Sequence, residues 1–296
     1  MIAVITTVRD GEQALAGLAD ALDAQTLRAF EWVVIDNASN DRTADVARAR
    51  GATVVTEPRP GRARARNRGV AATDAELLAF TDADCRPRPE WLAALVRRLQ
   101  DGEPVVAGRI VVTTSEPPNP IERFESLWRF RDDPQRGWAP TANLGMRRDA
   151  FEAIGGFDAR YRHIGEDVDL CLRAGAAGFA LTRCPDAVVE HPAETERRPV
   201  LRRSFEQAYS LHDLHRRHGL RPGRYWRNPG PAIFGDWALR RFGIDPADVP
   251  PAERRAVLRV ARRDYAARIA GSLWAPLRQK GLTLLSHRAT GFRSDV

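Results

Sequence analysis

The sequence predicts an α/β protein: a mostly parallel sheet with helices on both faces, followed by a helical C-terminal region. Two observations carry this prediction. Short apolar runs alternate with segments of helical periodicity over the first hundred residues, and from about Pro199 the chain reads as helices separated by Gly and Pro loops. Such alternation is typical of βαβ units. The length of 296 residues allows one large domain or two small ones, and we expect domains at 1–196 and 197–296.

Each early element has its own local signal. Leu15, Leu18 and Leu22 recur at helical spacing after the first apolar run, and a second helix is expected to end at Gly51. The expected strands are five apolar runs, at Ala3–Val8, Trp32–Ile35, Thr53–Thr56, Leu77–Thr81 and Val105–Thr113. Further helices are expected at Arg62–Ala72 and Pro89–Gln100.

The pattern breaks down from Ser115 to Pro140, which is rich in proline, aromatic and charged residues and is expected to be an irregular insertion. Its aromatic residues could stack on a sugar or belong to the core; they are Trp128, Phe130 and Trp138. Beyond it we expect the strand Thr141–Met146, a helix near Asp149–Ile154, a helix opening at Glu166, and short strands at Phe179–Arg183 and Ala187–Glu190.

Composition excludes several classes of protein. With 43% hydrophobic and 29% charged residues, the chain is neither disordered, collagen-like nor a coiled coil. No run approaches the roughly 18 apolar residues of a membrane span, and the opening MIAVITTVRD does not resemble a signal peptide. Three cysteines without a CxxC pair argue against a disulfide framework or a zinc site, so we expect a cytoplasmic protein.

The net charge of +7 is unevenly distributed along the chain. Residues 197–296 hold 21 basic and 8 acidic residues, a balance of +13, which leaves −6 for residues 1–196. The basic region could be a packed helical cap on the acceptor side, a contact with the inner face of an anionic membrane, or a nucleic-acid contact. Apolar residues such as Leu258 and Trp274 favour packing, with peripheral membrane contact second.

Asp82 and Asp84 directly follow an apolar strand. In open α/β sheets, ligands bind beyond the carboxyl ends of the strands. Two carboxylates one residue apart on a turn can face a divalent cation such as Mg²⁺ or Mn²⁺. Water and phosphate oxygens would complete the coordination of that cation. The alternative is a plain Asp-rich turn in which Asp84 caps the next helix.

Further polar residues end the first two strands. Asp36 can accept a hydrogen bond from a base N–H or a ribose hydroxyl, or it can cap a helix instead. Thr6, Thr7 and Arg9 are expected to lie beside it.

The segment GRARARNRG opens a helix that places two arginines one turn apart, on the same face. A helix N-terminus with the guanidinium groups of Arg62 and Arg66 suits a diphosphate.

Two later sites carry potential catalytic groups. Glu166 and Asp167 begin a helix, where acids commonly complement the helix dipole, but a carboxylate at such a tip could also act as a general base. His191 ends a strand-like segment and could be structural or a third metal ligand.

Taken together and in this order, the motifs from Ile2 to about Pro192 resemble the family-2 glycosyltransferases, which have the GT-A fold. The matching segments are VITTVRDGEQALAGLADALDAQT, VVIDNASNDRTADVA, GRARARNRG, FTDAD, TANLGMRRDAFEAIGGFD, GEDVDLCLR and VVEHP. The resemblance implies an inverting enzyme that moves a sugar from a UDP-, GDP- or dTDP-linked donor to an acceptor hydroxyl. The acceptor would be a glycan, a lipid-linked molecule or a small molecule.

The resemblance also implies roles for the candidate residues. Asp36 would contact the base, Asp82 the ribose or a metal-bound water, and Asp84 a divalent cation that His191 helps to hold. Asp167 would deprotonate the acceptor, with Glu166 as the alternative base. Asn143 and the turn Gly155–Asp158 would shape the sugar and acceptor pockets. The residues expected around the donor are Thr6, Thr7, Arg9, Asp36, Arg62, Arg66, Asn67, Asp82, Ala83 and Asn143.

Three other functions compete with this interpretation. A nucleotidyltransferase that makes nucleotide sugars needs a glycine-rich basic loop after the first strand, where this chain has TVRDGEQ. An arginine-rich nucleic-acid-binding or membrane-binding protein would leave the four acids unexplained, and no nucleic-acid-binding motif appears, so no nucleic-acid partner is expected. A dinucleotide-binding dehydrogenase would need a GxGxxG motif after a strand, and this chain has none.

Overall fold

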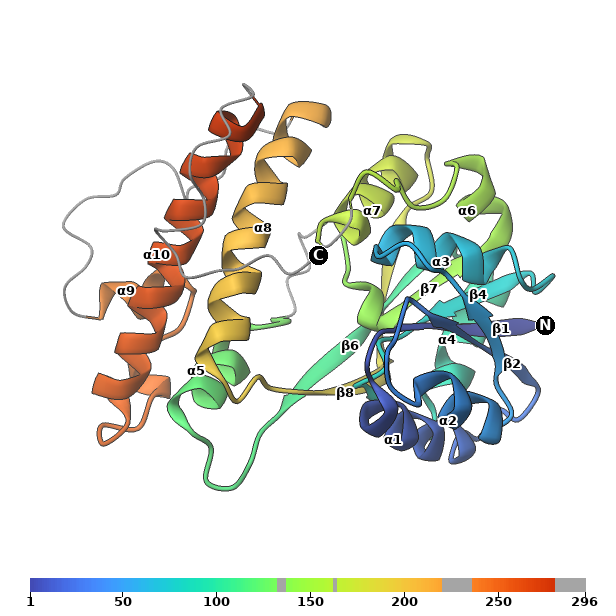
Figure 1. Ribbon diagram of the computed structural model, residues 1–296, viewed down its shortest axis with the longest axis horizontal. Helices are drawn as coiled ribbons and strands as arrows, with labels where there is room; N and C mark the ends of the chain where they lie inside the picture. The colour runs from blue at the N-terminus through green and yellow to red at the C-terminus, as the bar shows by residue number, and fades with distance from the viewer. Residues whose placement is uncertain (132–136, 162–163, 220–235, 280–296) are drawn as a thin grey trace.

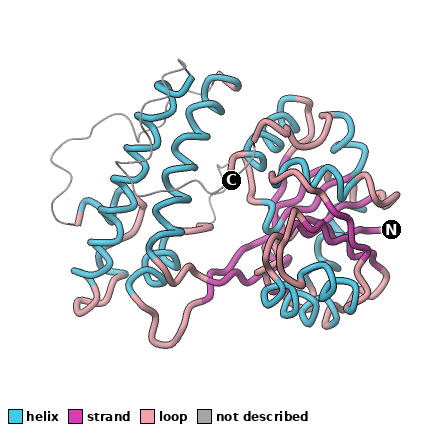
Figure 2. Tube along the Cα trace, viewed as in Figure 1, coloured by secondary structure: helices cyan, strands magenta, loops and turns pink. Residues whose placement is uncertain are grey.

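The computed structural model describes residues 1–131, 137–161, 164–219 and 236–279. It confirms the α/β fold class with a central sheet and a helical C-terminal region, and Figure 1 shows the two as neighbouring lobes. Figure 2 shows that the strands gather in one lobe, and β6 (Val105–Thr113) and β8 (Leu181–Pro192) extend from it toward the helices of the other. The helical prediction for 197–296 includes residues 220–235 and 280–296, which lie outside the described residues.

The sheet has eight strands in the order β3-β2-β1-β4-β7-β6-β8-β5. The first four strands in this order are parallel, whereas β7 runs antiparallel to both of its neighbours. The strands are β1 (Ile2–Val8), β2 (Phe30–Asp36), β3 (Thr53–Thr56), β4 (Leu77–Phe80), β5 (Arg86–Pro87), β6 (Val105–Thr113), β7 (Leu144–Arg147) and β8 (Leu181–Pro192).

Helices cover both faces of the sheet because side chains alternate along each strand (Figure 1). Val4 of β1 packs with α1 (Glu12–Asp23), α2 (Thr43–Ala49) and α4 (Trp91–Gln100). Ile5, its neighbour, packs on the opposite face with α3 (Arg62–Val70), α6 (Arg148–Ala153) and α7 (Glu166–Ala176). The loops at the carboxyl ends of the strands are therefore held between two packed layers.

Two expected short strands are in fact one. Phe179–Arg183 and Ala187–Glu190 correspond to the single strand β8, which pairs with β6 through a register shift between Gly108 and Arg109. The shift absorbs the polar residues that separate the two apolar signals, because a bulge lets extra residues oppose a shorter stretch of the partner strand. The expected strand Thr141–Met146 likewise begins as a short 3₁₀ turn before β7.

The expectation of an irregular insertion is wrong in its centre, where Pro120–Trp128 forms helix α5. The Asn119 side chain accepts hydrogen bonds from the N–H groups of Ile121 and Glu122, and Glu122 accepts from the Asn119 N–H. This capping box, with Pro120 at the first helical position, is a strong start signal. The many prolines and charges around it obscured that signal.

Helix α5 packs with helices from the end of the chain. Phe124 is fully buried in a cluster with Phe242, Leu258 and neighbouring residues of the C-terminal helices. Those helices are α8 (Arg197–Arg217), α9 (Trp237–Arg241) and α10 (Arg254–Gln279). The helical lobe thus includes one element from within residues 1–196, and the boundary after 196 remains a prediction. Within the described residues, no helix is both long and apolar enough to cross a membrane.

Candidate active site

The candidate residues gather where the parallel strands end. Asp36 is the last residue of β2 and pairs in register with Val8 of β1, while Asp82 and Asp84 lie on the turn that follows β4. His191 reaches the same turn from the far end of β8. We call Asp84 and His191 the donor rim.

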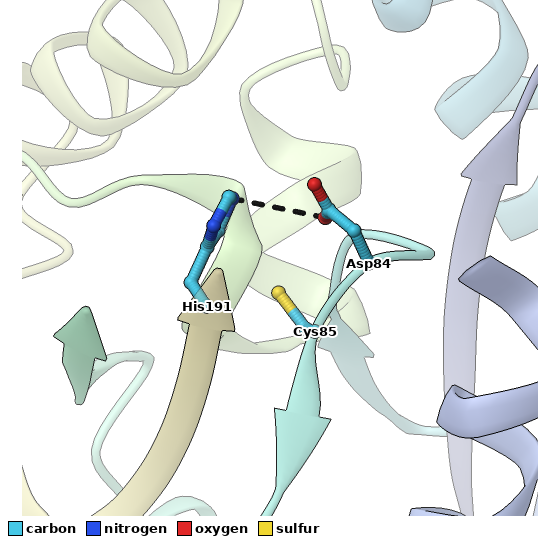
Figure 3. Close-up of side chains that lie close together, drawn as sticks. All are labelled: Asp84, Cys85 and His191. Carbon is cyan, nitrogen blue, oxygen red and sulfur yellow. Dashed lines mark ion pairs between the residues drawn. The ribbon is translucent and has the colours of Figure 1, made fainter. Parts of the chain in front are cut away.

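Asp84 and His191 approach each other across this rim, as Figure 3 shows. His191 Nε2 lies 3.7 Å from Asp84 Oδ1, and the Asp84 side chain is 47% exposed whereas the imidazole is buried. The Sγ of Cys85 completes a group whose potential ligand atoms all lie within 4.8 Å of one another. Burial, together with the charges of Asp82 and Asp84, raises the pKa of Cys85, so this thiol stays protonated at neutral pH.

The tautomer of His191 follows from its hydrogen bonding. Nδ1 lies 2.8 Å from the carbonyl oxygen of Pro192, which only accepts, so Nδ1 carries a proton and donates. In the neutral ring this tautomer leaves a lone pair on Nε2, the nitrogen that faces Asp84. A backbone acceptor behind one ring nitrogen is the usual way to orient a histidine toward a metal.

The donor set fits a divalent cation with oxygen and nitrogen ligands. A carboxylate and a neutral imidazole suit Mn²⁺, whereas a protonated thiol is no thiolate ligand. Asp82 is not part of this cluster, although its carboxylate was a candidate metal ligand: its Oδ1 accepts a hydrogen bond from Arg66 instead.

Arg129 and Phe130, which follow α5, also reach the donor rim. Arg129 Nη2 lies 3.5 Å from His191 Nε2, and the Phe130 ring packs on the imidazole with centroids 5.1 Å apart. Glu125 holds the Arg129 guanidinium at 3.0 Å. Sequence reasoning missed Arg129 because its segment was expected to be irregular; the capping box at Asn119 was the signal that could have placed it.

Arg66 joins the turn after β4 to the start of α7. Its buried guanidinium lies 3.0 Å from Asp82 Oδ1 and 2.6 Å from Glu166 Oε1. Burial alone would raise the pKa of Asp82, but Arg66 and Arg62 outweigh it, so the pKa lies below its ordinary value. The two ion pairs therefore fix two separate segments around one charged centre. We call Gly165–Asp167 with Arg66 the base turn.

Asp167 has the opposite electrostatic setting. Burial, followed by the negative charge of Glu166, raises the pKa of Asp167 to about 7. Gly165 precedes it with φ +102°, a conformation that favours glycine, and bends the chain into the helix. A carboxylate with a pKa near neutrality is suited to accept a proton there.

Two residues of the arginine-rich segment contact other parts of the protein, and their donor-binding roles stay predictions. Arg66 forms ion pairs with Asp82 and Glu166. The Asn67 side chain donates to the Phe157 carbonyl and accepts from the Phe157 N–H, so it fixes the Gly155–Asp158 turn. Arg62, one turn earlier, remains exposed at the surface.

Asn143 and Thr6 are fully buried and hydrogen-bonded within the protein. Asn143 is fully buried; it donates to the carbonyls of Arg109 and Ala187 and accepts from Trp91 Nε1. It therefore bridges β6 and β8 at their bulge. Thr6 is fully buried on the side of β1 that faces Trp32, from whose Nε1 it accepts a hydrogen bond.

The remaining candidates stay at the edge of the sheet. Asp36 is nearly buried, and its Oδ1 accepts from the Ser39 N–H, while Thr7 and Arg9 are partly accessible. Ala83 lies between the two aspartates of the turn and is buried. These residues remain predictions as contacts for a base or ribose.

Trp128 and Trp138 pack as partly buried residues. Trp128 lies against Phe124 and Phe242, and Trp138 lies against the core cluster beside α7. Both placements favour a core role over stacking on a sugar.

Comparison with known proteins gives consistent matches. Residues 3–155 match the model of the glycosyl transferase family 2. A pre-mycofactocin glycosyltransferase from Mycobacterium tuberculosis is 36% identical over 156 residues, which cover 49% of this chain and 33% of that protein. The glycosyltransferase AglE from Haloferax volcanii is 30% identical over 206 residues, 65% of this chain and 67% of AglE. The chain thus spans about a third of the mycobacterial relative and two thirds of AglE.

Solved structures show the same fold. A mannosyltransferase from Pyrobaculum calidifontis, in complex with GDP-mannose and Mn²⁺, aligns with a TM-score of 0.64 at 20% identity, covering 94% of this chain and 87% of that one. TarS from S. aureus aligns with a TM-score of 0.52 at 15% identity over 92% of this chain and 54% of its own.

Proposed function

This chain belongs to glycosyl transferase family 2, and from that premise we propose that it transfers a sugar from a nucleoside-diphosphate sugar to an acceptor hydroxyl, with inversion at the anomeric carbon. The observation that supports this most directly is the bridge through Arg66. It ties the turn that carries Asp82 and Asp84 to the helix that begins with Glu166 and Asp167. This bridge supports a site in which groups suited to a leaving diphosphate lie near a group suited to activate a nucleophile.

The donor would lie along the strand ends. Asp36, Thr7 and Arg9 border the place for the base, and Asp82, ionised and partly exposed, is available to a ribose hydroxyl. Arg62 and Arg129 supply positive charge on the two sides of the turn after β4, which suits a diphosphate. The neighbouring mannosyltransferase binds GDP-mannose, so this donor is the first to test, with UDP- and dTDP-sugars after it.

Asp84 and His191 would hold the divalent cation, Mn²⁺ or Mg²⁺. When bound, such a cation stabilises the negative charge that develops on the leaving nucleoside diphosphate. The protein's contribution is to orient the two ligands: Pro192 fixes the imidazole tautomer, and Phe130 packs against the ring.

Asp167 supplies the base for the transfer. The acceptor oxygen attacks the anomeric carbon, its proton passes to an Asp167 carboxylate oxygen, and the bond from the anomeric carbon to the diphosphate oxygen breaks. The nucleoside diphosphate leaves with the electron pair of that bond, on the face opposite the attack. Glu166, the alternative base, is held in its ion pair with Arg66.

The helical lobe borders the acceptor side of this arrangement. A side-chain carbon placed on Gly165 would lie 3.3 Å from Leu214 and 3.4 Å from Ser210, both of which belong to α8. We therefore assign donor binding and catalysis to residues 1–196, and part of the acceptor boundary to the helical lobe. The acceptor itself belongs to one of three classes: a glycan, a lipid-linked molecule or a small molecule.

Thermal unfolding with nucleotides tests the donor half of the proposal. GDP, UDP and dTDP are each added with and without Mn²⁺; one of them should raise the melting temperature only when Mn²⁺ is present. The Asp84→Ala variant should lose this shift. Product NMR after transfer then reports the anomeric configuration. A retained configuration, or no nucleotide-dependent stabilisation with any cation, would contradict the proposal.

A further inference from the structure

Helix α10 carries an unusual exposed face. Three large hydrophobic side chains are exposed among the described residues, and two of them, Ile269 and Leu273, lie one turn apart on this helix. Leu273 is 58% exposed and Ile269 is 37% exposed. Residues on the opposite side, such as Val257 and Ala261, are fully buried against the other helices of the lobe. Within the described part of the chain, these two aliphatic side chains are therefore not buried by the fold.

Arginines continue the same face toward the start of the helix. Arg255, Arg259 and Arg263 are exposed and recur every four residues, and Ala266 and Ala270 link them to the aliphatic end. Spacings of three and four residues place side chains on one side of a helix. We call this stripe, from Arg255 to Leu273, the α10 outer face.

No acid interrupts the positive charge of this face. The single acidic residue of α10, Asp264, is buried on the inner side, where it accepts from Arg268 at 2.7 Å and from the Ser204 hydroxyl. Among the described residues, no carboxylate forms an ion pair with Arg255, Arg259 or Arg263. Their charge is thus available to a partner outside the chain.

We propose that the α10 outer face rests on an anionic lipid surface, with the arginines at the phosphate level and Ile269 and Leu273 in the upper acyl region. Basic and aliphatic residues combined on one face are what an interfacial helix needs. A nucleic acid would match the arginines but leave the aliphatic side chains without a partner. A second copy of this chain would place two positive faces against each other. The inference does not depend on the proposed transfer reaction.

The magnitude follows from the charges and the aliphatic area. Each arginine near an anionic membrane surface contributes about a five-fold increase in the partition coefficient, equivalent to about 1 kcal/mol. The two aliphatic side chains should each contribute roughly ten-fold when buried. Salt should weaken the contribution of the arginines and leave that of the aliphatic side chains unchanged, since screening acts on exposed charges.

Vesicle flotation tests the proposal with the full chain. Vesicles of equimolar phosphatidylcholine and phosphatidylglycerol should carry the protein upward at low salt, whereas pure phosphatidylcholine vesicles should not. The double variant Arg259→Glu/Arg263→Glu should reduce binding at least about 25-fold, because two five-fold contributions are lost. Ile269→Ser/Leu273→Ser should weaken binding at both low and high salt. Since all four side chains lie outward, each variant should keep the wild-type melting temperature.

A matched control changes the same charge elsewhere. Arg48→Glu/Arg97→Glu alters two arginines whose side chains are 58% and 61% exposed, on α2 and α4 of the sheet lobe. It should bind vesicles like the wild type. The lipid assignment fails if the control loses as much binding as the α10 variant, or if wild type ignores anionic vesicles at low salt. It also fails if sedimentation shows a dimer that Leu273→Ser dissociates, or if only nucleic acid binds the α10 outer face.

Discussion

Asp84 and Asp167 lie on two segments that Arg66 joins, but in different surroundings. At the donor rim, Asp84 is half exposed and its neighbour His191 is held by a backbone carbonyl, so neither residue is needed to balance a buried charge. At the base turn, Glu166 and Arg66 are both buried and neutralise each other, and Asp167 has a raised pKa beside them. The difference teaches that donor-rim substitutions should affect function alone, whereas base-turn substitutions should also affect folding.

The largest expected effect separates the two properties at Asp167. Asp167→Asn should lower transfer by about 10²–10⁴-fold while donor affinity is nearly unchanged, because only proton acceptance is lost. The raised pKa means that ionisation of Asp167 costs folding free energy as pH rises from about 4 toward 7. The variant should therefore melt at least as high as wild type above neutral pH. A large loss of donor affinity would place Asp167 on the donor rim instead.

Arg66→Met tests whether Arg66 is structural or a phosphate ligand. Removing it leaves Glu166 and Asp82 without their cation, which should cost about 3–5 kcal/mol of unfolding free energy in urea titrations. The matched control is Arg64→Met, a less buried neighbour in the same helix, which should change stability by no more than about 0.5 kcal/mol. If Arg66→Met kept full stability and lost only donor affinity, the original diphosphate role would be restored.

Asp84→Ala breaks the donor rim without touching the base turn. Transfer should fall by about 10²–10³-fold, as for loss of a group that stabilises the leaving charge. Calorimetry should show that Mn²⁺ no longer strengthens nucleotide binding, while the melting temperature without ligand stays close to wild type. Metal-stimulated turnover by this variant would count against the ligand role of Asp84.

The pH profile sharpens the comparison further. Below pH 7 Asp167 is increasingly protonated and cannot accept a proton, so kcat/KM should fall about ten-fold per pH unit on the acid side and reach a plateau above neutrality. Asp167→Asn should lose this dependence. An acid limb that persists in the variant would assign it to another group.

The smallest expected effect concerns Arg129. Arg129→Ala should weaken binding of the nucleoside diphosphate or slow transfer by about ten-fold, the contribution of one charge-assisted hydrogen bond. Glu125 would then have Arg203 as its partner, with which it already forms an ion pair, so folding should be affected little. Equal donor affinity and equal rate in the variant would leave Arg129 with a structural role only.

The sequence predicted the sheet lobe well because its signals are local. The strands at Thr53–Thr56 and Val105–Thr113 have the expected bounds, and the turn after β4 places Asp82 and Asp84 where the strand-end rule puts them. The same local signals gave two wrong expectations. The prolines around Asn119 obscured helix α5, and a bulge joins two expected strands into the single strand β8.

The site was harder to predict, because sequence gives the type of a residue but not the direction of its side chain. Asn67, Asn143 and Arg66 are polar residues of the matching motifs, yet each satisfies buried groups of the protein itself. The approach of His191 to Asp84 depends on how far β8 runs past the bulge, which no local pattern encodes.

The burial of Phe124 among the C-terminal helices has a consequence for building hybrid enzymes. Helix α5 precedes β7, α6, α7 and β8 of the sheet lobe in the chain, yet its core partners follow that lobe. If the last hundred residues were replaced by those of a relative, Phe124 would have to pack against helices from another protein, and this core contact would be mismatched. A functional graft needs three crossover points, one on each side of α5 and one after β8, so that the whole helical lobe is exchanged together.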